Sequence, residues 1–348
     1  MQPIVLQHSR KSVRRAGECL VKAPDDLDAF FAAYDVLDNW RVSHAYPIQS
    51  MLGYFRAKAF DTDSKAVVAR RLKRTPSIVA KLKREPGMKL DRMEDIGGVR
   101  IIVESLEKVK GVHILIKEGR TRNILRRERD YISQPKPSGY RGIHLIYRYN
   151  GAKVSAFPFH NVELQIRTKI QHAWATTVEV VGTFTRQGLK ASRGSKEWLD
   201  FFTLAGDVFA ALEHGILGSA DYAKRDRLIE KSERLGVLSK LQAYAVTTQY
   251  VNDRSPKDAK FFIMTLNADS GKILVSRFSN LALATKVYGE KEIELRSSDS
   301  EDVVLVSTES LRTLKLAYPN YFADTTHFRE KLRQLMANKT SHPTADSA

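Results

Sequence analysis

Apolar residues recur at helical spacing in some parts of the chain and at strand spacing in others, which predicts a mixed α+β fold. Residues 25–58 follow a period of about 3.6 residues, with an interruption expected at Pro47. Residues 64–83 are predicted to be a second helix with a boundary near Thr75, because the following proline disfavours helical backbone before it. Further helices are expected over residues 168–181, 196–214 and 223–244.

Short apolar or alternating runs predict a sheet in the middle of the chain. Residues 99–103 form an apolar run typical of a buried strand, and residues 161–167 alternate between apolar and polar side chains. Residues 143–149 and 153–157 flank the Asn-Gly pair at 150–151, which predicts a β-hairpin because both turn residues tolerate positive φ. A mixed sheet flanked by helices is therefore expected.

The pattern changes near residue 245, and the remaining chain reads as a small, separate α/β module. We therefore divide the chain into a first domain (1–244), a C-terminal module (245–340) and a disordered tail (341–348). The strands expected in the module cover residues 260–266, 273–278 and 303–307, and its helices cover 280–288 and 309–316.

Charge adds a functional direction to this picture. The formal net charge is +17; residues 1–244 carry 43 Lys and Arg against 27 Asp and Glu, whereas residues 245–348 carry 14 against 13. The basic surplus of the first domain is suited to polyphosphate or nucleic acid as a partner, and a soluble, merely basic surface is the alternative. A single cysteine excludes a disulfide framework and zinc fingers built on paired cysteines.

Two further absences indicate where the protein acts. No stretch approaches the roughly 20 apolar residues that a membrane-spanning helix needs. The first basic residues follow the short apolar run instead of preceding it, which is the wrong order for a secretory signal. We expect a cytoplasmic protein with no membrane partner.

Four segments carry candidate chemistry, and the first two combine cations with a carboxylate. Lys73, Ser77 and Lys81 are spaced four residues apart, so a continuous helix would place them on one face suited to a triphosphate. A solvated basic face is the alternative. Asp95 stands just before a buried strand, at the end of which ligand sites tend to form. A helix-terminating Asp with a turn is the alternative there.

The other two segments lie farther along the chain. Prolines and glycines order the stretch from Asp130 to His144, which presents Lys136 to a phosphate and Tyr140 for stacking on a base. On the next predicted strand, the alternation directs three polar side chains to the face opposite the apolar one, as a site or as a solvated edge. These side chains are Glu163, Gln165 and Arg167.

Together the segments suit transfer of a phosphoryl-type group. Asp95 and Glu163 supply two carboxylates for Mg²⁺, which prefers oxygen ligands and bridges substrate phosphates. The lysines neutralise charge on the phosphates, and Glu163 is placed to accept a proton from an attacking hydroxyl. The common Gly-rich nucleotide loops and the Gly-x-Ser-x-Gly elbow do not occur.

The order of these segments, over residues 56–185, resembles the synthetase domain of the RelA/SpoT family, which makes the alarmone ppGpp. The phrases Asp-Tyr-Ile-x-x-Pro-Lys-Pro-x-Gly-Tyr-Arg-Gly-Ile-His and Glu-Leu-Gln-Ile-Arg-Thr carry the resemblance. It implies a nucleotidyltransferase-like fold and transfer of pyrophosphate from ATP to a ribose 3′-hydroxyl of GDP or GTP. No His-Asp cluster of a metal-dependent hydrolase domain precedes these segments, and in this respect the chain resembles the short, single-function branch of the family.

The resemblance also implies a role for each matching residue. Glu163 is implied as the base that activates the acceptor hydroxyl. Arg71, Lys73, Ser77 and Lys81 are implied to bind ATP, Asp95 and Glu163 to bind Mg²⁺, and Lys136, Tyr140, His144, Gln165, Arg167 and Ala175 to surround the acceptor.

Two other functions stay open at this point. Some short relatives resemble toxins that modify the 3′-end of tRNA, in which a C-terminal segment restrains the enzyme until a protein trigger releases it. The basic residues Arg122, Arg126 and Arg127 are suited to an RNA backbone, and the appended module is compatible with self-inhibition. A catalytically inactive binding protein is the third hypothesis, disfavoured because both candidate metal carboxylates are present.

Overall fold

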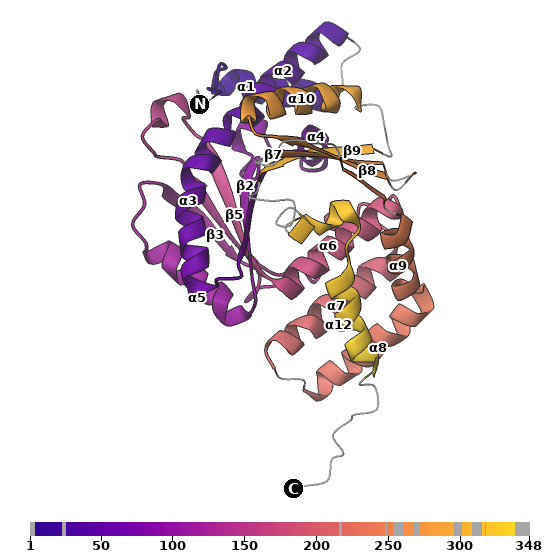
Figure 1. The fold of residues 1–348 in the computed structure, drawn as a ribbon. Coiled ribbons are helices and arrows are strands. Elements are labelled where there is room, and N and C mark those ends of the chain that lie inside the picture. The colour runs from indigo at the N-terminus through magenta and orange to yellow at the C-terminus, as the bar shows by residue number, and fades with distance from the viewer. Residues whose placement is uncertain are drawn as a thin grey trace, which may run out of the picture.

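The computed structural model describes residues 4–22, 26–215, 218–247, 249–252, 261–267, 270, 272–295, 301–307, 315–316 and 318–337. Within these residues, nine strands form one mixed sheet in the order β3-β4-β5-β2-β1-β9-β7-β8-β6. The expected mixed α+β fold, a sheet flanked by helices, is confirmed (Figure 1). The strands are β1 (Val67–Leu72), β2 (Gly97–Val103), β3 (Ile124–Asp130), β4 (Ile143–Arg148), β5 (Asn161–Thr168), β6 (Gln249–Asn252), β7 (Phe261–Asn267), β8 (Lys272–Phe278) and β9 (Glu301–Ser307).

The helices agree with most of the periodic segments. The break expected near Pro47 lies at His44, between α2 and α3, and the helix expected over 223–244 is interrupted at Gly236, whose φ of 61° ends α8. The helices are α1 (Arg10–Lys22), α2 (Leu27–Ser43), α3 (Ala45–Thr62), α4 (Thr75–Arg84), α5 (Leu106–Glu118), α6 (Lys169–Phe184), α7 (Lys196–Glu213), α8 (Ser219–Leu235), α9 (Val237–Thr247), α10 (Leu281–Glu294) and α12 (Thr326–Ala337). None of the helices in the described ranges has the length and apolar character to cross a membrane.

Two expectations about local structure are wrong. Residues 64–83 are not one helix: β1 pairs antiparallel with β2, and α4 starts only at Thr75, next to Pro76. Residues 153–157 do not form a hairpin strand but contain a short 3₁₀ turn, because the antiparallel partner of β4 is β5. In both places the partner strand lies farther along the chain, so local pattern alone does not reveal it.

One face of β1, β2, β4 and β5 is an apolar core that α3 and α5 cover. Val162, Leu164 and Ile166 of β5 are fully buried there with residues from β2 and β4, as the alternation predicted. Each such side chain contributes roughly 1.5–3 kcal/mol by leaving water. The opposite face of the same strands therefore remains for polar side chains.

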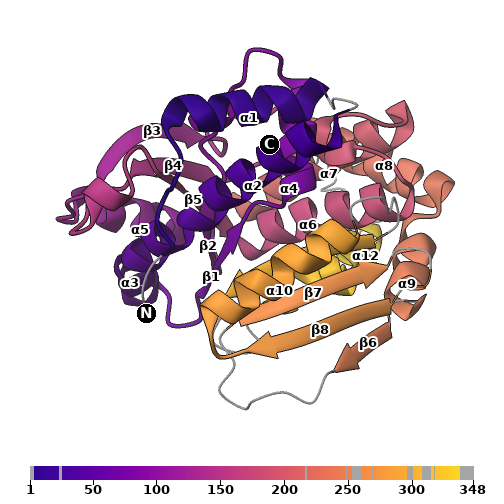
Figure 2. The ribbon, with the colours of Figure 1, turned by 90° about the horizontal axis from the view of Figure 1, so that it is seen from above.

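The C-terminal elements join the first domain through both the sheet and the helices. β9 pairs with β1 through Arg70 and Arg71, so the sheet continues from one half of the chain into the other. α12 packs into the helical cluster formed by α6 to α9, and Figures 1 and 2 show it alongside these helices. The division at residue 244 stays a prediction, and most of 309–316 and the tail 341–348 lie outside the described residues.

Helix α1 provides a test of how tightly the first domain is packed. A Cβ at Gly17 would lie 2.7 Å from Leu90 Cβ, whereas a Cβ at Gly53 of α3 would meet nothing within 4 Å. We expect Gly17→Ala to lower the free energy of unfolding by about 1–3 kcal/mol. Gly53→Ala should raise it by up to about 1 kcal/mol through helix propensity. Urea denaturation of both variants measures the free energy of unfolding. Equal changes in the two variants would contradict the close packing at Gly17.

Candidate active site

Asp95 lies just ahead of β2 and is held by two ammonium groups from different elements. Lys73 Nζ, in the link between β1 and α4, is 2.9 Å from Oδ2, and Lys81 Nζ of α4 is 3.0 Å from Oδ1. The single helix face expected for Lys73, Ser77 and Lys81 is wrong, because Lys73 precedes the helix. The corner between β1 and α4 nevertheless brings both lysines to Asp95, while Ser77 lies in the first turn of α4.

This cluster keeps Asp95 ionised. Burial raises the pKa of Asp95, but the ammonium groups of Lys73 and Lys81 outweigh burial and hold that pKa well below its usual range. Burial lowers the pKa of Lys73, and the Asp95 carboxylate opposes that shift. An ionised carboxylate between two lysines is a site where phosphate oxygens can replace carboxylate oxygens as partners of the ammonium groups.

A closed ring of hydrogen bonds surrounds Glu163 on β5. Glu163 Oε1 is 2.8 Å from His144 Nδ1, and Oε2 accepts from Gln165 Nε2 at 2.8 Å. Gln165 Oε1 accepts from Arg167 Nη2 at 2.8 Å, and the same nitrogen donates to the Tyr140 hydroxyl at 2.5 Å. His144 Nε2 closes the ring at 2.5 Å from that hydroxyl. The polar strand face and the loop expected to hold the acceptor therefore meet.

The ring has one consistent arrangement of protons. Burial lowers the pKa of His144, so its imidazole is neutral at neutral pH. Nδ1–H then donates to Glu163, and Nε2 accepts from the Tyr140 hydroxyl. Burial raises the pKa of Glu163, but the hydrogen bond and electrostatic interaction with His144 and the hydrogen bond from Gln165 together outweigh burial, and the pKa lies below its usual value. Glu163 is thus an ionised base whose two oxygens are already oriented.

The loop between β3 and β4 presents Lys136 and Tyr140 next to this ring. The Lys136 ammonium lies over the Tyr131 ring at 4.5 Å and over the Tyr140 ring at 5.0 Å. The Arg167 guanidinium lies over Tyr140 at 4.8 Å. A base that stacks on Tyr140 therefore has to replace one of these cations. Ala175 of α6 packs against the same helical cluster as Tyr140.

Two residues that the sequence motifs did not indicate, Arg100 and Tyr318, lie near Arg71. Arg100 shares a face of β2 with Gly98, and its guanidinium lies 5.2 Å from the centre of the Tyr318 ring. Tyr318 is 2% exposed, and the charges of Arg100 and Arg71 act on it. Strand alternation would have singled out Arg100, but no sequence signal places Tyr318 here, more than 200 residues away along the chain.

Of the three arginines expected to bind RNA, Arg126 and Arg127 lie on β3 and Arg122 lies just before it. Arg127 Nη1 donates to Glu94 Oε2 at 3.2 Å and so points toward the polar face. Arg122 lies before the strand, where its carbonyl oxygen accepts from Asn150 Nδ2 at 3.2 Å. Arg122 and Arg126 are exposed and make no ion pair with any residue in the described ranges.

Comparison with known proteins agrees with this geometry. Residues 70–182 match the family described as "Region found in RelA / SpoT proteins". Residues 70–182 are thus similar to this family, and we refer to them as the RelA/SpoT region. It contains Asp95, Glu163 and the loop that holds Tyr140, whereas α7 and Tyr318 lie beyond it.

Relatives of the RelA/SpoT region are enzymes by name. GTP pyrophosphokinase YjbM of Bacillus subtilis is 34% identical over 111 residues, 31% of this chain and 52% of that protein. GTP pyrophosphokinase of Escherichia coli K12 is 31% identical over 137 residues, 39% of this chain and 17% of that protein. The chain thus spans about half or less of these relatives. The crystal structure of small alarmone synthetase 1 from Bacillus subtilis bound to its product pppGpp has a TM-score of 0.43 at 23% identity, covering 49% of this chain and 90% of that one.

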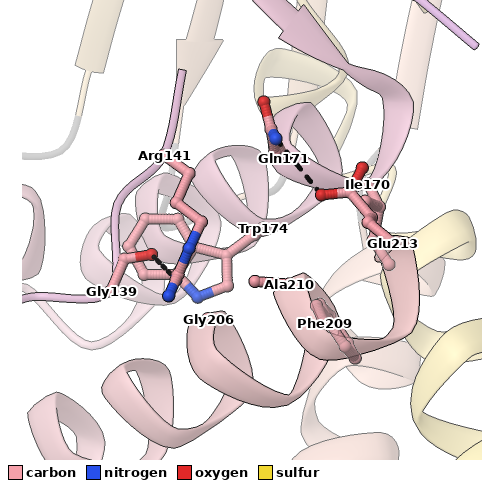
Figure 3. A pocket seen from close by; sticks show the side chains of 9 residues that line it. All are labelled: Gly139, Arg141, Ile170, Gln171, Trp174, Gly206, Phe209, Ala210 and Glu213. Atoms are coloured by element: carbon pink, nitrogen blue, oxygen red, sulfur yellow. Dashed lines mark hydrogen bonds between the residues drawn. The ribbon is translucent and has the colours of Figure 1, made fainter. Parts of the chain in front are cut away.

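A small pocket lies behind the loop, between the RelA/SpoT region and α7. Figure 3 shows Arg141, Trp174 and Glu213 around it, with Gln171 Nε2 donating to Glu213 Oε2 at 3.2 Å. Burial raises the pKa of Glu213 to about 7. Because this exceeds the value of about 4.3 for an exposed Glu, the neutral form contributes stability that is complete below about pH 4.3 and is lost as the pH rises through 7.

Replacing this carboxyl group by an amide should therefore have a pH-dependent effect. We expect Glu213→Gln to be more stable than the wild type at about pH 8.5, by on the order of 1–3 kcal/mol, and to differ little at about pH 5. Urea denaturation at both pH values measures this. Glu197→Gln, at an exposed position of the same helix, serves as the control. A stability difference between Glu213→Gln and the wild type that does not change with pH would contradict the raised pKa of Glu213.

Proposed function

We propose that the protein is an ATP-dependent pyrophosphokinase that transfers the β,γ-pyrophosphate of ATP to the ribose 3′-hydroxyl of GDP or GTP. The observation that carries this proposal is the placing of two ionised carboxylates at neighbouring parallel strands, Asp95 just ahead of β2 and Glu163 on β5. The lysine cluster adjoins one carboxylate and the Tyr140 loop adjoins the other. The names of the relatives in Bacillus subtilis and Escherichia coli support the guanine nucleotide as acceptor.

Mg²⁺ is the metal that this donor set suits. Both groups are ionised carboxylates with oxygen donors, and the parallel pairing of β2 with β5 sets Gly98 opposite Glu163, with Asp95 just ahead of β2. No group of three or more His, Cys, Asp or Glu side chains gathers anywhere in the described residues. The two carboxylates would therefore hold the ion together with substrate phosphate oxygens, and the ion would neutralise phosphate charge.

The proposed reaction forms one bond and breaks one bond. The acceptor O3′ bonds to the β-phosphorus of ATP, and the bond from that phosphorus to the oxygen bridging to the α-phosphate breaks, which releases AMP. Lys73 and Lys81 neutralise the phosphate charge, and Arg71 adds a cation on the adjoining strand. The proton of the 3′-hydroxyl passes to Glu163.

The low pKa of Glu163 makes it a weak base, and this fits a loose transition state. In such a transition state the acceptor oxygen has formed little bond to phosphorus, so its proton leaves late and needs little driving force. His144 and Gln165 hold the carboxylate in one orientation. The contribution of Glu163 is therefore mainly orientation of the acceptor hydroxyl, with proton transfer following.

Removing either carboxylate charge should abolish transfer while the fold remains. We expect Glu163→Gln and Asp95→Asn to lower the rate of AMP formation by about 10²–10⁴-fold. Glu104→Gln, at an exposed carboxylate beyond the other end of β2, is the control and should retain full activity. The assay uses β-labelled ATP with GDP, GTP or bulk tRNA. Undiminished transfer by Glu163→Gln would exclude the proposed role.

A second candidate function is favoured by the position of the C-terminal segment. Tyr318 covers the polar face next to Arg71 and Arg100, and the Leu316 carbonyl oxygen is 3.2 Å from His172 Nε2 on α6. Aromatic rings and nucleotide bases compete for the same guanidinium planes. A restrained enzyme that modifies the 3′-end of tRNA, released by a protein trigger, is compatible with this contact and with exposed Arg122 and Arg126.

If Tyr318 restrains the enzyme, its removal should raise activity. We expect Tyr318→Ala to increase the initial rate by at least about tenfold and to lower the KM for ATP, because the guanidinium faces become available. Tyr288→Ala is the control: that tyrosine is also buried but lies against Arg41, far from the polar face. Equal activation by both variants would indicate general loosening of the C-terminal elements. The labelled acceptor, guanine nucleotide or tRNA, distinguishes the two functions.

A further inference from the structure

Helix α7 lies outside the RelA/SpoT region, yet the loop that carries Tyr140 (residues 131–142) packs against it. The loop has hydrogen bonds of its own: Gly139 N–H donates to Lys136 O at 2.8 Å, Lys136 N–H donates to Tyr140 O at 3.3 Å, and Tyr131 N–H donates to Gly142 O at 2.9 Å. Gly139 has a φ of 87°, a conformation that favours glycine. These bonds fix the turns within the loop, whereas the position of the loop relative to Glu163 depends on the element against which it packs.

The loop and the helix approach each other backbone to backbone. A Cβ at Gly206 of α7 would lie 2.5 Å from Gly139 O and 2.9 Å from Gly139 Cα, both rigid backbone atoms. A Cβ at Gly139 would in turn lie 3.0 Å from Phe202 O. Thr203 Oγ1 donates to Pro137 O at 3.3 Å. Only a helix with glycine at position 206 can come this close, since any side chain there would displace the loop.

An ion pair between Arg141 and Asp207 also holds the loop against α7. Arg141 Nη2 donates to Asp207 Oδ1 at 3.0 Å, and Arg141 Nη1 donates to Gly139 O at 3.0 Å, as Figure 3 shows for the second bond. Only 11% of the Arg141 side chain is exposed, so the pair is screened less than a surface pair. Lys224 of α8 also reaches Asp207, at 3.2 Å, and fixes the carboxylate from the other side.

The position of Tyr140 follows from these contacts. Tyr140 stands between Gly139 and Arg141, the two loop residues that α7 holds, and its hydroxyl belongs to the ring around Glu163. A shift of the loop away from α7 would therefore move Tyr140 and Lys136 relative to the carboxylate. The Asp95 cluster would stay in place, because it is built on β1, β2 and α4.

We propose that Gly206 and Asp207 of α7 are positioning residues that set the affinity for the acceptor without contributing to ATP binding. This inference rests on the proposed function, since the acceptor is defined by that reaction. It assigns a role to a helix outside the matched region.

The test uses the full chain with Gly206→Ala and Asp207→Asn. Both variants should raise the KM for the acceptor at least tenfold, leave the dissociation constant of a non-hydrolysable ATP analogue within twofold of the wild-type value, and speed hydrogen exchange in residues 131–142. Asp200→Asn is the matched control, because Asp200 lies on the same helix and pairs with Lys231 instead of the loop. Alanine is also the better helix former, so Gly206→Ala leaves α7 helical and acts through the contact with Gly139.

The outcomes separate this inference from the proposed function. Unchanged acceptor KM and unchanged loop exchange in both variants would overturn the inference, as would equal weakening of acceptor and ATP binding. If the wild-type protein transfers label to no acceptor, the proposed function fails. Hydrogen exchange in residues 131–142 then decides by itself whether α7 holds the loop in place. Faster exchange in both variants, with Asp200→Asn like the wild type, supports the inference in that case.

Discussion

The parallel pairing of β2 with β5 is the constraint on which the rest of the site depends. Its register places Gly98 opposite Glu163, so the carboxylate that precedes β2 lies beside the carboxylate on β5. A slip of one residue would turn Glu163 into the dry core and Val162 or Leu164 toward the polar face. The burial of those apolar side chains under α3 and α5 therefore also fixes the position of the two carboxylates.

The polar face is stable because its charges are paired. Asp95 is matched by two lysines, and each oxygen of Glu163 accepts a hydrogen bond. Burying a charge without such partners costs several kcal/mol, so these partners are needed for folding as well as for chemistry. The same ammonium groups that now hold Asp95 are suited to phosphate oxygens, so a substrate exchanges partners in the site without creating unpaired charge.

The elements outside the RelA/SpoT region contribute from two directions. α7 supports the loop that carries Tyr140, and the segment around Tyr318 covers Arg100 from the other end of the polar face. The pairing of β9 with β1 passes through Arg71, so the C-terminal strands and a residue of the site share backbone hydrogen bonds. Changes in the C-terminal half can therefore reach the site through the sheet itself.

Local pattern determined much of this molecule. The alternation over residues 161–167 predicted which side chains of β5 face the core and which face the site, because a strand has a fixed period of two. The motif phrases contain Tyr140 and Glu163, and the place of Asp95 before an apolar run added it to the predicted site. The same reasoning misassigned β1, since Val-Val-Ala-Arg-Arg-Leu suits a helix or a strand until the pairing with β2 is known.

What the sequence by itself determined is thus the polar face, its carboxylates and the loop that adjoins them, all within a few residues of recognisable patterns. The tertiary structure alone decided that Lys73 meets Asp95 from a strand end, that Asp207 holds Arg141, and that Tyr318 lies on Arg100. The physical reason is that these contacts join segments that are separate in the sequence, by more than 200 residues in the case of Arg100 and Tyr318. Their geometry depends on how buried faces of separate elements pack together, which no local periodicity encodes.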